Sequence, residues 1–239
     1  MKSIFSLLVC WLAMIFTSGA TLALVLDNPS PAKYLGSCAT IDVDHPSIQS
    51  MAKKLAIQAS EGISSNSAKF DHEFDIIRTC FEFVRDEIQH SWDYQTDNPE
   101  APATCRASEV LQHKTGFCYA KSHLLAALLR ANNIPAGLCY QRLTIADDGS
   151  GPPYCLHGLN AVYLKELGQW YRLDPRGLKP GIQQAMFSPP QEALAFSLQT
   201  EGEVDFPEIW VEPMPAIVES LRNAKIWKEA ADNLPDLIP

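Results

Sequence analysis

The sequence lacks closely spaced cysteine pairs. Seven cysteines occur among its 239 residues, and none of them form a C-x-x-C arrangement, the spacing typical of zinc fingers and thioredoxin-like redox proteins. Neither class is therefore favoured. Six cysteines would be available for disulfides if the chain is exported. Cys80 and Cys139, however, lie within apolar periodic segments, where a buried free thiol is the ordinary case.

The sequence also lacks a run or stripe of basic residues. It contains 19 Lys and Arg against 28 Asp and Glu, and its formal net charge is -9. Nucleic-acid binding depends on clustered cations that neutralise phosphates, so we expect no nucleic-acid partner. Internal repeats and low-complexity segments are absent as well. The length and a hydrophobic content of 46% predict one globular domain with a sizeable core.

Residues 4–26 contain no charged side chain, and Lys2 is the only charged residue before Asp27. A helix of this length would just cover a hydrocarbon layer of about 30 Å. The same segment fits a secretory signal, with small residues after its apolar part. We expect residues 1–26 to be a signal peptide or membrane anchor, with membrane contact only through residues 4–26, and residues 27–239 to form one exported or membrane-anchored domain. The alternative is a cytoplasmic protein with a mis-set translation start.

The pattern in the rest of the chain predicts an α+β fold. Apolar residues at helical spacing predict three amphipathic helices, a central helix that is apolar on most sides, and a C-terminal helix. Alternating segments predict an antiparallel sheet packed on the central helix. The expected helices cover residues 44–59, 74–90, 107–112, 115–131 and 215–230, and the expected strands cover residues 137–145, 157–164 and 169–173.

Cys118 is the first candidate for chemistry. It lies near the start of the central helix, where unpaired N–H groups and the helix dipole favour a thiolate. Thr115 is a candidate helix cap, and Gly116 would let another segment pass close to the sulfur. Taken alone, Cys118 is more often a small core residue, so its partners must decide its role.

The predicted hairpin supplies those partners. If Leu164 and Gln169 close a four-residue turn, Leu159 lies opposite Asp174. His157 and Leu159 point to the same face because side chains alternate along a strand. His157 and Asp174 are then diagonal neighbours, within reach of a carboxylate–imidazole hydrogen bond, and a shift of the register by one residue would separate them. Cys118, His157 and Asp174 together form a nucleophile, base and orienting carboxylate.

Other residues are weaker candidates. His123 lies about 140° around the helix from Cys118, and His113 has no visible orienting carboxylate. Cys155 is a rival nucleophile, but it is expected in a proline-rich loop and lacks a helix start. A metal site formed by Cys118, His157 and Asp174 is not favoured, because structural zinc sites usually need four ligands. We expect no metal and no cofactor.

Four blocks resemble the transglutaminase-like superfamily, and in particular its small bacterial members. The resemblance covers residues 74–180 well and extends more loosely to residues 41–46 and 208–239. One departure is Asn133, where the family pattern often has Gly, but Asn tolerates the left-handed conformation. The blocks are Gly116-Phe117-Cys118-Tyr119, Asn133-Ile134-Pro135-Ala136-Gly137, His157-Gly158-Leu159-Asn160-Ala161-Val162 and Gly168-Gln169-Trp170-Tyr171-Arg172-Leu173-Asp174-Pro175-Arg176-Gly177.

The resemblance implies a papain-like fold whose central helix bears the nucleophile Cys118. It further implies that His157 is the general base and acid, and that Asp174 orients His157. The expected activity is acyl transfer or hydrolysis on an amide of a protein or peptide substrate through a thioester. The alternative is a catalytically silent interaction module with the same fold. The backbone N–H of Cys118 is the default oxyanion donor, and side-chain candidates are Gln112, Gln141 and Trp92.

Overall fold

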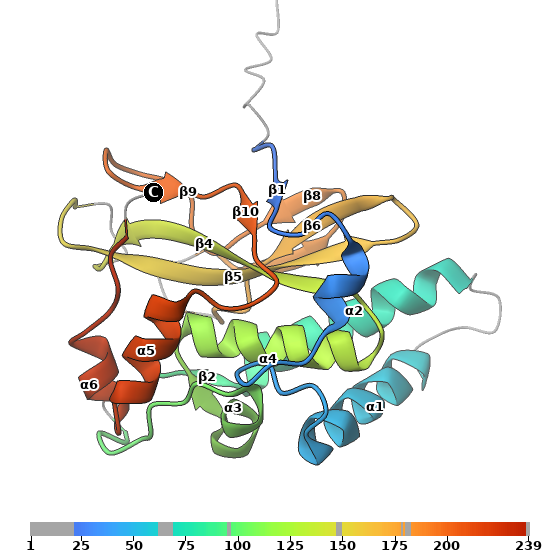
Figure 1. Cartoon of the computed structure of the whole chain (residues 1–239), viewed down its shortest axis with the longest axis horizontal. Helices are drawn as coiled ribbons and strands as arrows, with labels where there is room; N and C mark the ends of the chain where they lie inside the picture. Colours follow the sequence, from blue (N-terminus) through green and yellow to red (C-terminus); the bar gives the residue numbers. More distant parts are fainter. Residues whose placement is uncertain are drawn as a thin grey trace, which may run out of the picture.

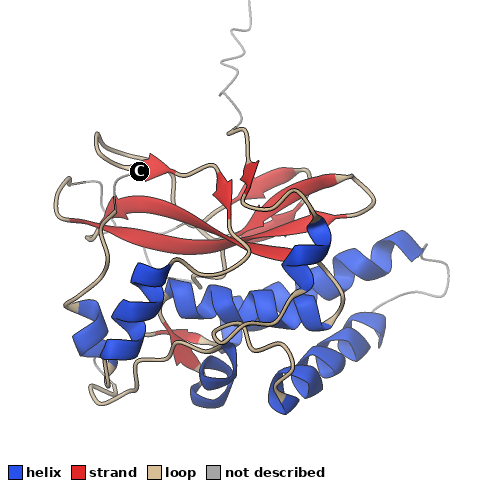
Figure 2. Ribbon diagram, in the orientation of Figure 1, coloured by secondary structure: helices blue, strands red, loops and turns tan. Residues whose placement is uncertain are grey.

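In the computed structural model, the described residues are 22–61, 69–94, 97–146, 150–177, 179 and 183–237. Four antiparallel strands form a sheet that lies over a layer of helices (Figures 1 and 2). The predicted α+β fold is confirmed. The strands, in their order across the sheet, are β6 (Gln169–Leu173), β5 (Tyr154–Leu164), β4 (Ala136–Thr144) and β9 (Val204–Asp205).

The helix α4 (Cys118–Ala131) occupies the centre of the helical layer, beneath the sheet (Figure 1). It contacts β4 and β5 on one side and other helices elsewhere. All its residues from Cys118 to Arg130 are buried, as expected for a helix that is apolar on most sides. The other helices are η1 (Pro31–Leu35, a 3-10 helix), α1 (Pro46–Glu61), α2 (Lys69–Glu87), α3 (Ala107–His113), α5 (Pro215–Asn223) and α6 (Trp227–Ala231).

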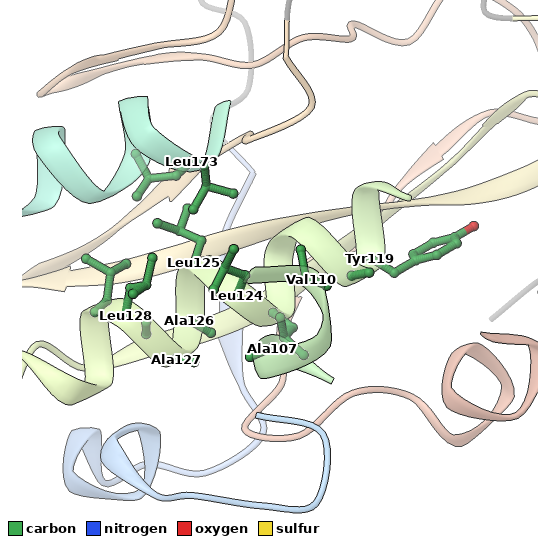
Figure 3. Close-up of a cluster of buried hydrophobic side chains, with 14 of the residues drawn as sticks. Ala107, Val110, Tyr119, Leu124, Leu125, Ala126, Ala127, Leu128 and Leu173 are labelled. Carbon is green, nitrogen blue, oxygen red and sulfur yellow. The ribbon is translucent and has the colours of Figure 1, made fainter. Parts of the chain in front are cut away.

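Leucines of α4 form the middle of the hydrophobic core (Figure 3). Leu124, Leu125 and Leu128 are fully buried and belong to one cluster with Leu173 of β6. A second cluster contains Leu159 of β5 together with Tyr34, Cys139, Ala161 and Ile209. Two clusters follow from the alternation of side chains between the faces of a sheet.

The predicted hairpin register is confirmed. Leu164 pairs with Gln169, and the ladder continues to Asn160 opposite Leu173. It ends there, so Asp174 follows the last residue of β6 and is not itself in the ladder. The strand β5 begins at Tyr154, earlier than the predicted residue 157, because Tyr154 and Cys155 pair with Thr144 and Leu143 of β4. The prediction of a proline-rich loop is therefore wrong at Cys155, which lies in β5.

Two predicted helices are shorter than expected, and the residues that they leave out form a small parallel ladder. The helix expected to reach residue 90 ends at Glu87, and the central helix begins at Cys118 instead of residue 115. The released residues form β2 (Gln89–His90) and β3 (Thr115–Gly116), which pair with each other. Thr115 is consequently not a helix cap. Phe117 occupies the N-cap position and forms no side-chain cap hydrogen bond.

The predicted helix over residues 215–230 is interrupted. Residues 224–226 separate α5 from α6, because the backbone at this break forms hydrogen bonds with a distant loop. The Ala103 N–H donates to Lys225 O, and the N–H of Trp227, the first residue of α6, donates to Ala101 O. Asn133, at the end of α4, has a φ of 59°, the left-handed conformation that its side chain tolerates.

Short strands occur where mostly loops were expected. They are β7 (Met186–Ser188), β8 (Gln191–Ala193) and β10 (Glu208–Ile209). The strand β1 (Val25–Leu26) pairs with β10, so the end of the uncharged segment joins the folded domain. Most of the predicted signal or anchor, residues 1–21, lies outside the described residues. Within the described part of the chain, no helix is long and apolar enough to cross a membrane.

Candidate active site

Cys118 is the first residue of α4 and faces β5. Its side chain is 7% exposed, and the Gly158 N–H donates to Sγ at 3.4 Å. This close approach requires a glycine, because a Cβ at residue 158 would lie 2.9 Å from Tyr119 Cδ1 and 3.0 Å from Tyr119 Cα. The Tyr119 hydroxyl donates to Leu156 O and fixes the start of α4 to β5.

His157, on β5, links Cys118 to Asp174. Its Nε2 lies 2.9 Å from Asp174 Oδ2, and its ring also makes a hydrogen bond with the Cys118 side chain. The ring packs edge-on against Phe196, with centroids 4.8 Å apart. The structure thus brings together all three residues that the sequence nominated.

Asp174 is completely buried just after β6. Two further donors hold its carboxylate: the Arg176 N–H donates to Oδ1 at 3.0 Å, and the Ala195 N–H donates to Oδ2 at 3.1 Å. Burial by itself would raise the pKa of Asp174, but the His157 charge and these hydrogen bonds outweigh it, so its pKa is lowered. The carboxylate is ionised and fixed in position.

The pKa of His157 moves in the opposite direction. Burial lowers it, but the Asp174 carboxylate and the Cys118 side chain raise it more, and the resulting pKa is about 10. An imidazole beside a buried carboxylate holds its proton strongly. His157 is therefore protonated at neutral pH, as a thiolate–imidazolium pair requires.

A small cavity of about 50 Å³ opens beside Cys118 and His157. Apolar and aromatic side chains supply most of its wall, including Leu143 of β4, Leu156 of β5 and Leu234. A second cavity of about 280 Å³ adjoins it and is lined largely by charged residues. His90 and Arg176 line both cavities.

Three residues near the nucleophile escaped the sequence analysis. Lys121, on α4, is completely buried, and its Nζ donates to Arg85 O, Ile88 O and Arg176 O at 3.3, 2.6 and 3.2 Å. Arg176 forms a two-pronged ion pair with Asp93, at 2.9 and 3.3 Å. The Cys118 N–H is directed at His90, with 3.2 Å between the Cys118 nitrogen and Nε2.

Only one of the three had a signal in the sequence. A lysine inside an otherwise apolar helix must find buried partners, and this pattern could have identified Lys121. His90 and Arg176 did not, because their positions depend on segments distant in sequence.

The weaker candidates do not share the surroundings of Cys118. His123 is buried, and its Nδ1 lies 2.8 Å from Cys105 O; burial lowers its pKa to about 4. His113 is exposed at the end of α3. Cys155 lines the small cavity, but from a strand instead of a helix start.

The proposed oxyanion donors also differ in position. Trp92 lines the small cavity. Gln112 is exposed on α3. Gln141 is paired with His157 across the ladder, and its Oε1 has no hydrogen-bond partner among the described residues, but Gln141 is not part of the cavity wall. Across the described ranges, no group of three or more His, Cys, Asp or Glu side chains is arranged to hold a metal ion.

Three solved structures are similar to this chain. The first is a protein from Cytophaga hutchinsonii named for a proposed cysteine protease activity (16% identity, TM-score 0.43, covering 65% of this chain and 46% of that one). The second is the periplasmic domain of TgpA from Pseudomonas aeruginosa bound to ethylmercury (16% identity, TM-score 0.38, covering 61% of this chain and 48% of that one). The third is a TGase (13% identity, TM-score 0.36, covering 61% of this chain and 35% of that one). The matched part of this chain spans less than half of each of these proteins.

No curated protein matches the sequence significantly. A family model does match: that of the transglutaminase-like superfamily, over residues 61–175. This range starts at the end of α1, contains Cys118 and His157, and ends one residue after Asp174. Residues 61–175 of this chain thus form a transglutaminase-like core.

Proposed function

We propose that this chain is a thiol enzyme that transfers or hydrolyses acyl groups of amides in protein or peptide substrates. Cys118 is the nucleophile, His157 the general acid and base, and Asp174 the residue that orients His157. The observation that supports this proposal most is the buried contact of 2.9 Å between His157 and Asp174, with Cys118 as a further side-chain partner of the same imidazole.

The reaction has two stages. In the first, the Cys118 thiolate forms a bond to the amide carbon, the carbonyl electron pair moves to oxygen, and the C–N bond breaks as His157 gives its proton to the departing nitrogen. An amine leaves, and a thioester remains. In the second stage, neutral His157 takes a proton from water or a second amine, which attacks the thioester and regenerates the Cys118 thiolate.

Alkylation with iodoacetamide at several pH values tests the nucleophile. We expect Cys118 to react faster than the other cysteines at neutral pH, because the protonated His157 stabilises its thiolate. This rapid reaction gives a fast phase of alkylation, which the Cys118→Ala variant should lose. The matched control is Cys155→Ala, which removes the other cysteine of the small cavity and should keep it. If Cys118 reacts no faster than the remaining thiols and His157→Ala changes nothing, the catalytically silent module is the correct description.

Incubation with a glutamine peptide, with and without an added primary amine, separates the two reaction types. Formation of the amide of the added amine supports acyl transfer. Free acid as the sole product in both incubations identifies a hydrolase and excludes the transferase.

For location, we propose that residues 1–26 direct the domain across a membrane or anchor it there. Cell fractionation and protease protection of the full-length chain test this. A chain recovered wholly in the cytoplasm with residues 1–26 intact would contradict export.

A further inference from the structure

His90 is held against the start of α4 by the β2–β3 ladder. His90 pairs with Gly116, and the Ser91 N–H donates to Gly116 O at 3.0 Å. This pairing brings a residue 28 positions earlier in the chain to the backbone of Cys118. The His90 side chain is 9% exposed and lines the small cavity together with Cys118. Its ring contacts Phe117 edge-on, with centroids 5.7 Å apart.

Two backbone N–H groups point at the His90 ring. The Cys118 nitrogen lies 3.2 Å from Nε2, and the Trp92 nitrogen lies 3.3 Å from Nδ1. A neutral imidazole has one nitrogen that accepts and one that donates, whereas an imidazolium has two donors. Burial, followed by the positive charges of Arg176 and Lys121, lowers the pKa of His90 far below its usual value. The ring is therefore neutral, and only one of the two N–H groups can have an acceptor there.

The two possible tautomers have different consequences. With the proton on Nδ1, the Cys118 N–H has an acceptor and is not available to a substrate. With the proton on Nε2, the Trp92 N–H donates to Nδ1. Nε2–H and the Cys118 N–H then have no acceptor in each other, and both are left to donate to a group bound in the cavity that His90 and Cys118 line. Two donor nitrogens 3.2 Å apart can both lie about 2.9 Å from one oxygen atom.

We propose that His90, protonated on Nε2, is a catalytic residue that forms the oxyanion hole of this site together with the Cys118 N–H. This inference rests on the proposed function. As the Cys118 sulfur bonds to the carbonyl carbon, the π-electron pair moves to the oxygen, which accepts hydrogen bonds from both donors. No proton is transferred from His90. When the C–N bond breaks, the electron pair returns from oxygen to re-form the carbonyl group.

The geometry favours His90 over the two glutamine side chains nominated from sequence. Gln112 is exposed on α3, and Gln141 is outside the cavity wall. Trp92 contributes through its backbone, because its N–H holds Nδ1 as an acceptor and so keeps the proton on Nε2. A neutral donor fixed in a buried site stabilises developing negative charge without reorganisation.

Comparison of two thiol reactions tests the proposal. Acylation of Cys118 by p-nitrophenyl acetate creates an oxyanion, whereas alkylation by iodoacetamide does not. We expect His90→Leu to lower the acylation rate about 10²- to 10³-fold and to leave the alkylation rate unchanged. His90→Gln, which keeps an N–H donor, should acylate faster than His90→Leu. His123→Gln, at a buried histidine bonded to Cys105 O, is the matched control and should leave both rates unchanged.

The tautomer itself can be measured by ¹⁵N NMR of the histidine rings in the wild-type protein, free and after addition of a peptide aldehyde. We expect the His90 proton on Nε2 in both samples, and this readout does not depend on turnover or on the folding of a variant. The proposal is overturned if His90→Leu acylates at the wild-type rate, or if the proton is on Nδ1 in the aldehyde adduct. By contrast, a wild-type protein that is never acylated at Cys118 refutes the proposed function, and the oxyanion hole with it.

Discussion

Asp174 illustrates how single residues set the chemistry of this site. Its carboxylate has no exposed surface and accepts three hydrogen bonds, from His157, Arg176 and Ala195. Such a group stays ionised, because the donors compensate for the loss of water. Its negative charge is in turn the largest of the effects that raise the pKa of His157, which reaches about 10 despite burial. The protonation state of the proposed acid is therefore determined by a neighbour that does not touch the substrate.

The Asp174→Asn variant removes that charge while nearly preserving shape. We expect the pKa of His157 to fall, so that the decline of kcat/KM at alkaline pH, near pH 10 in the wild type, moves to lower pH. Turnover should drop by about 10³- to 10⁴-fold, as for other orienting carboxylates. A pH profile on an amide substrate checks this. Asp93→Asn, which breaks the ion pair to Arg176, is the control. An unchanged alkaline limb in Asp174→Asn would show that the carboxylate does not control His157.

At the scale of elements, α4 both forms the core of the domain and carries Cys118, the proposed nucleophile. Its leucines fill the centre of the main hydrophobic cluster, and its first residue is Cys118. The position of the thiol relative to β5 is therefore fixed by packing along the whole helix.

Leu124→Ala should destabilise the protein by about 2 to 5 kcal/mol, because Leu124 is completely buried and truncation leaves a cavity. Urea unfolding measures the change. The control is Leu167→Ala in the turn between β5 and β6, where the side chain is 42% exposed, and it should change stability by less than about 0.5 kcal/mol. Equal effects of the two variants would contradict the central role of α4.

At the scale of the whole molecule, buried Lys121 joins three parts of the chain. Its ammonium group donates to the end of α2, to the segment before β2, and to Arg176 O in the loop after Asp174. Burial first, and then the charge of Arg176, lower the pKa of Lys121 to about 7. His157 and Lys121 are thus shifted in opposite directions within one site.

These shifts predict opposite effects of pH on stability. Between about pH 7 and the normal lysine pKa of 10.5, unfolding takes up a proton at Lys121, so this residue makes stability rise with pH. Between pH 6.5 and about 10, the folded protein holds a proton on His157 that the unfolded chain releases, so stability falls with rising pH.

We therefore expect Lys121→Met to show a steeper loss of stability than the wild type from pH 7 to 10, and His157→Gln to show a gain over that range. Denaturant unfolding at several pH values measures both slopes. Parallel curves for the wild type and Lys121→Met would show that Lys121 titrates normally.

The sequence determined the features that depend on local pattern. Apolar spacing predicted α4, because a buried helix shows its period within one segment. A four-residue turn predicted the register of β5 and β6, and with it the contact of His157 and Asp174, since a register is fixed once a turn is fixed. The motif blocks around Cys118 and Asp174 then predicted the superfamily, which the match over residues 61–175 confirms.

Tertiary structure alone decided the surroundings of the nucleophile. The β2–β3 ladder has two residues on each strand, too few for any period in the sequence, and its partners are far apart in the chain. Because His90 pairs with β3, the preceding helix ends before it, and the His90 ring lies against the Cys118 N–H. The break after α5 has the same cause, because hydrogen bonds from residues 101–103 compete with the helix. Contacts between distant segments leave no local pattern to detect, so only the folded chain shows them.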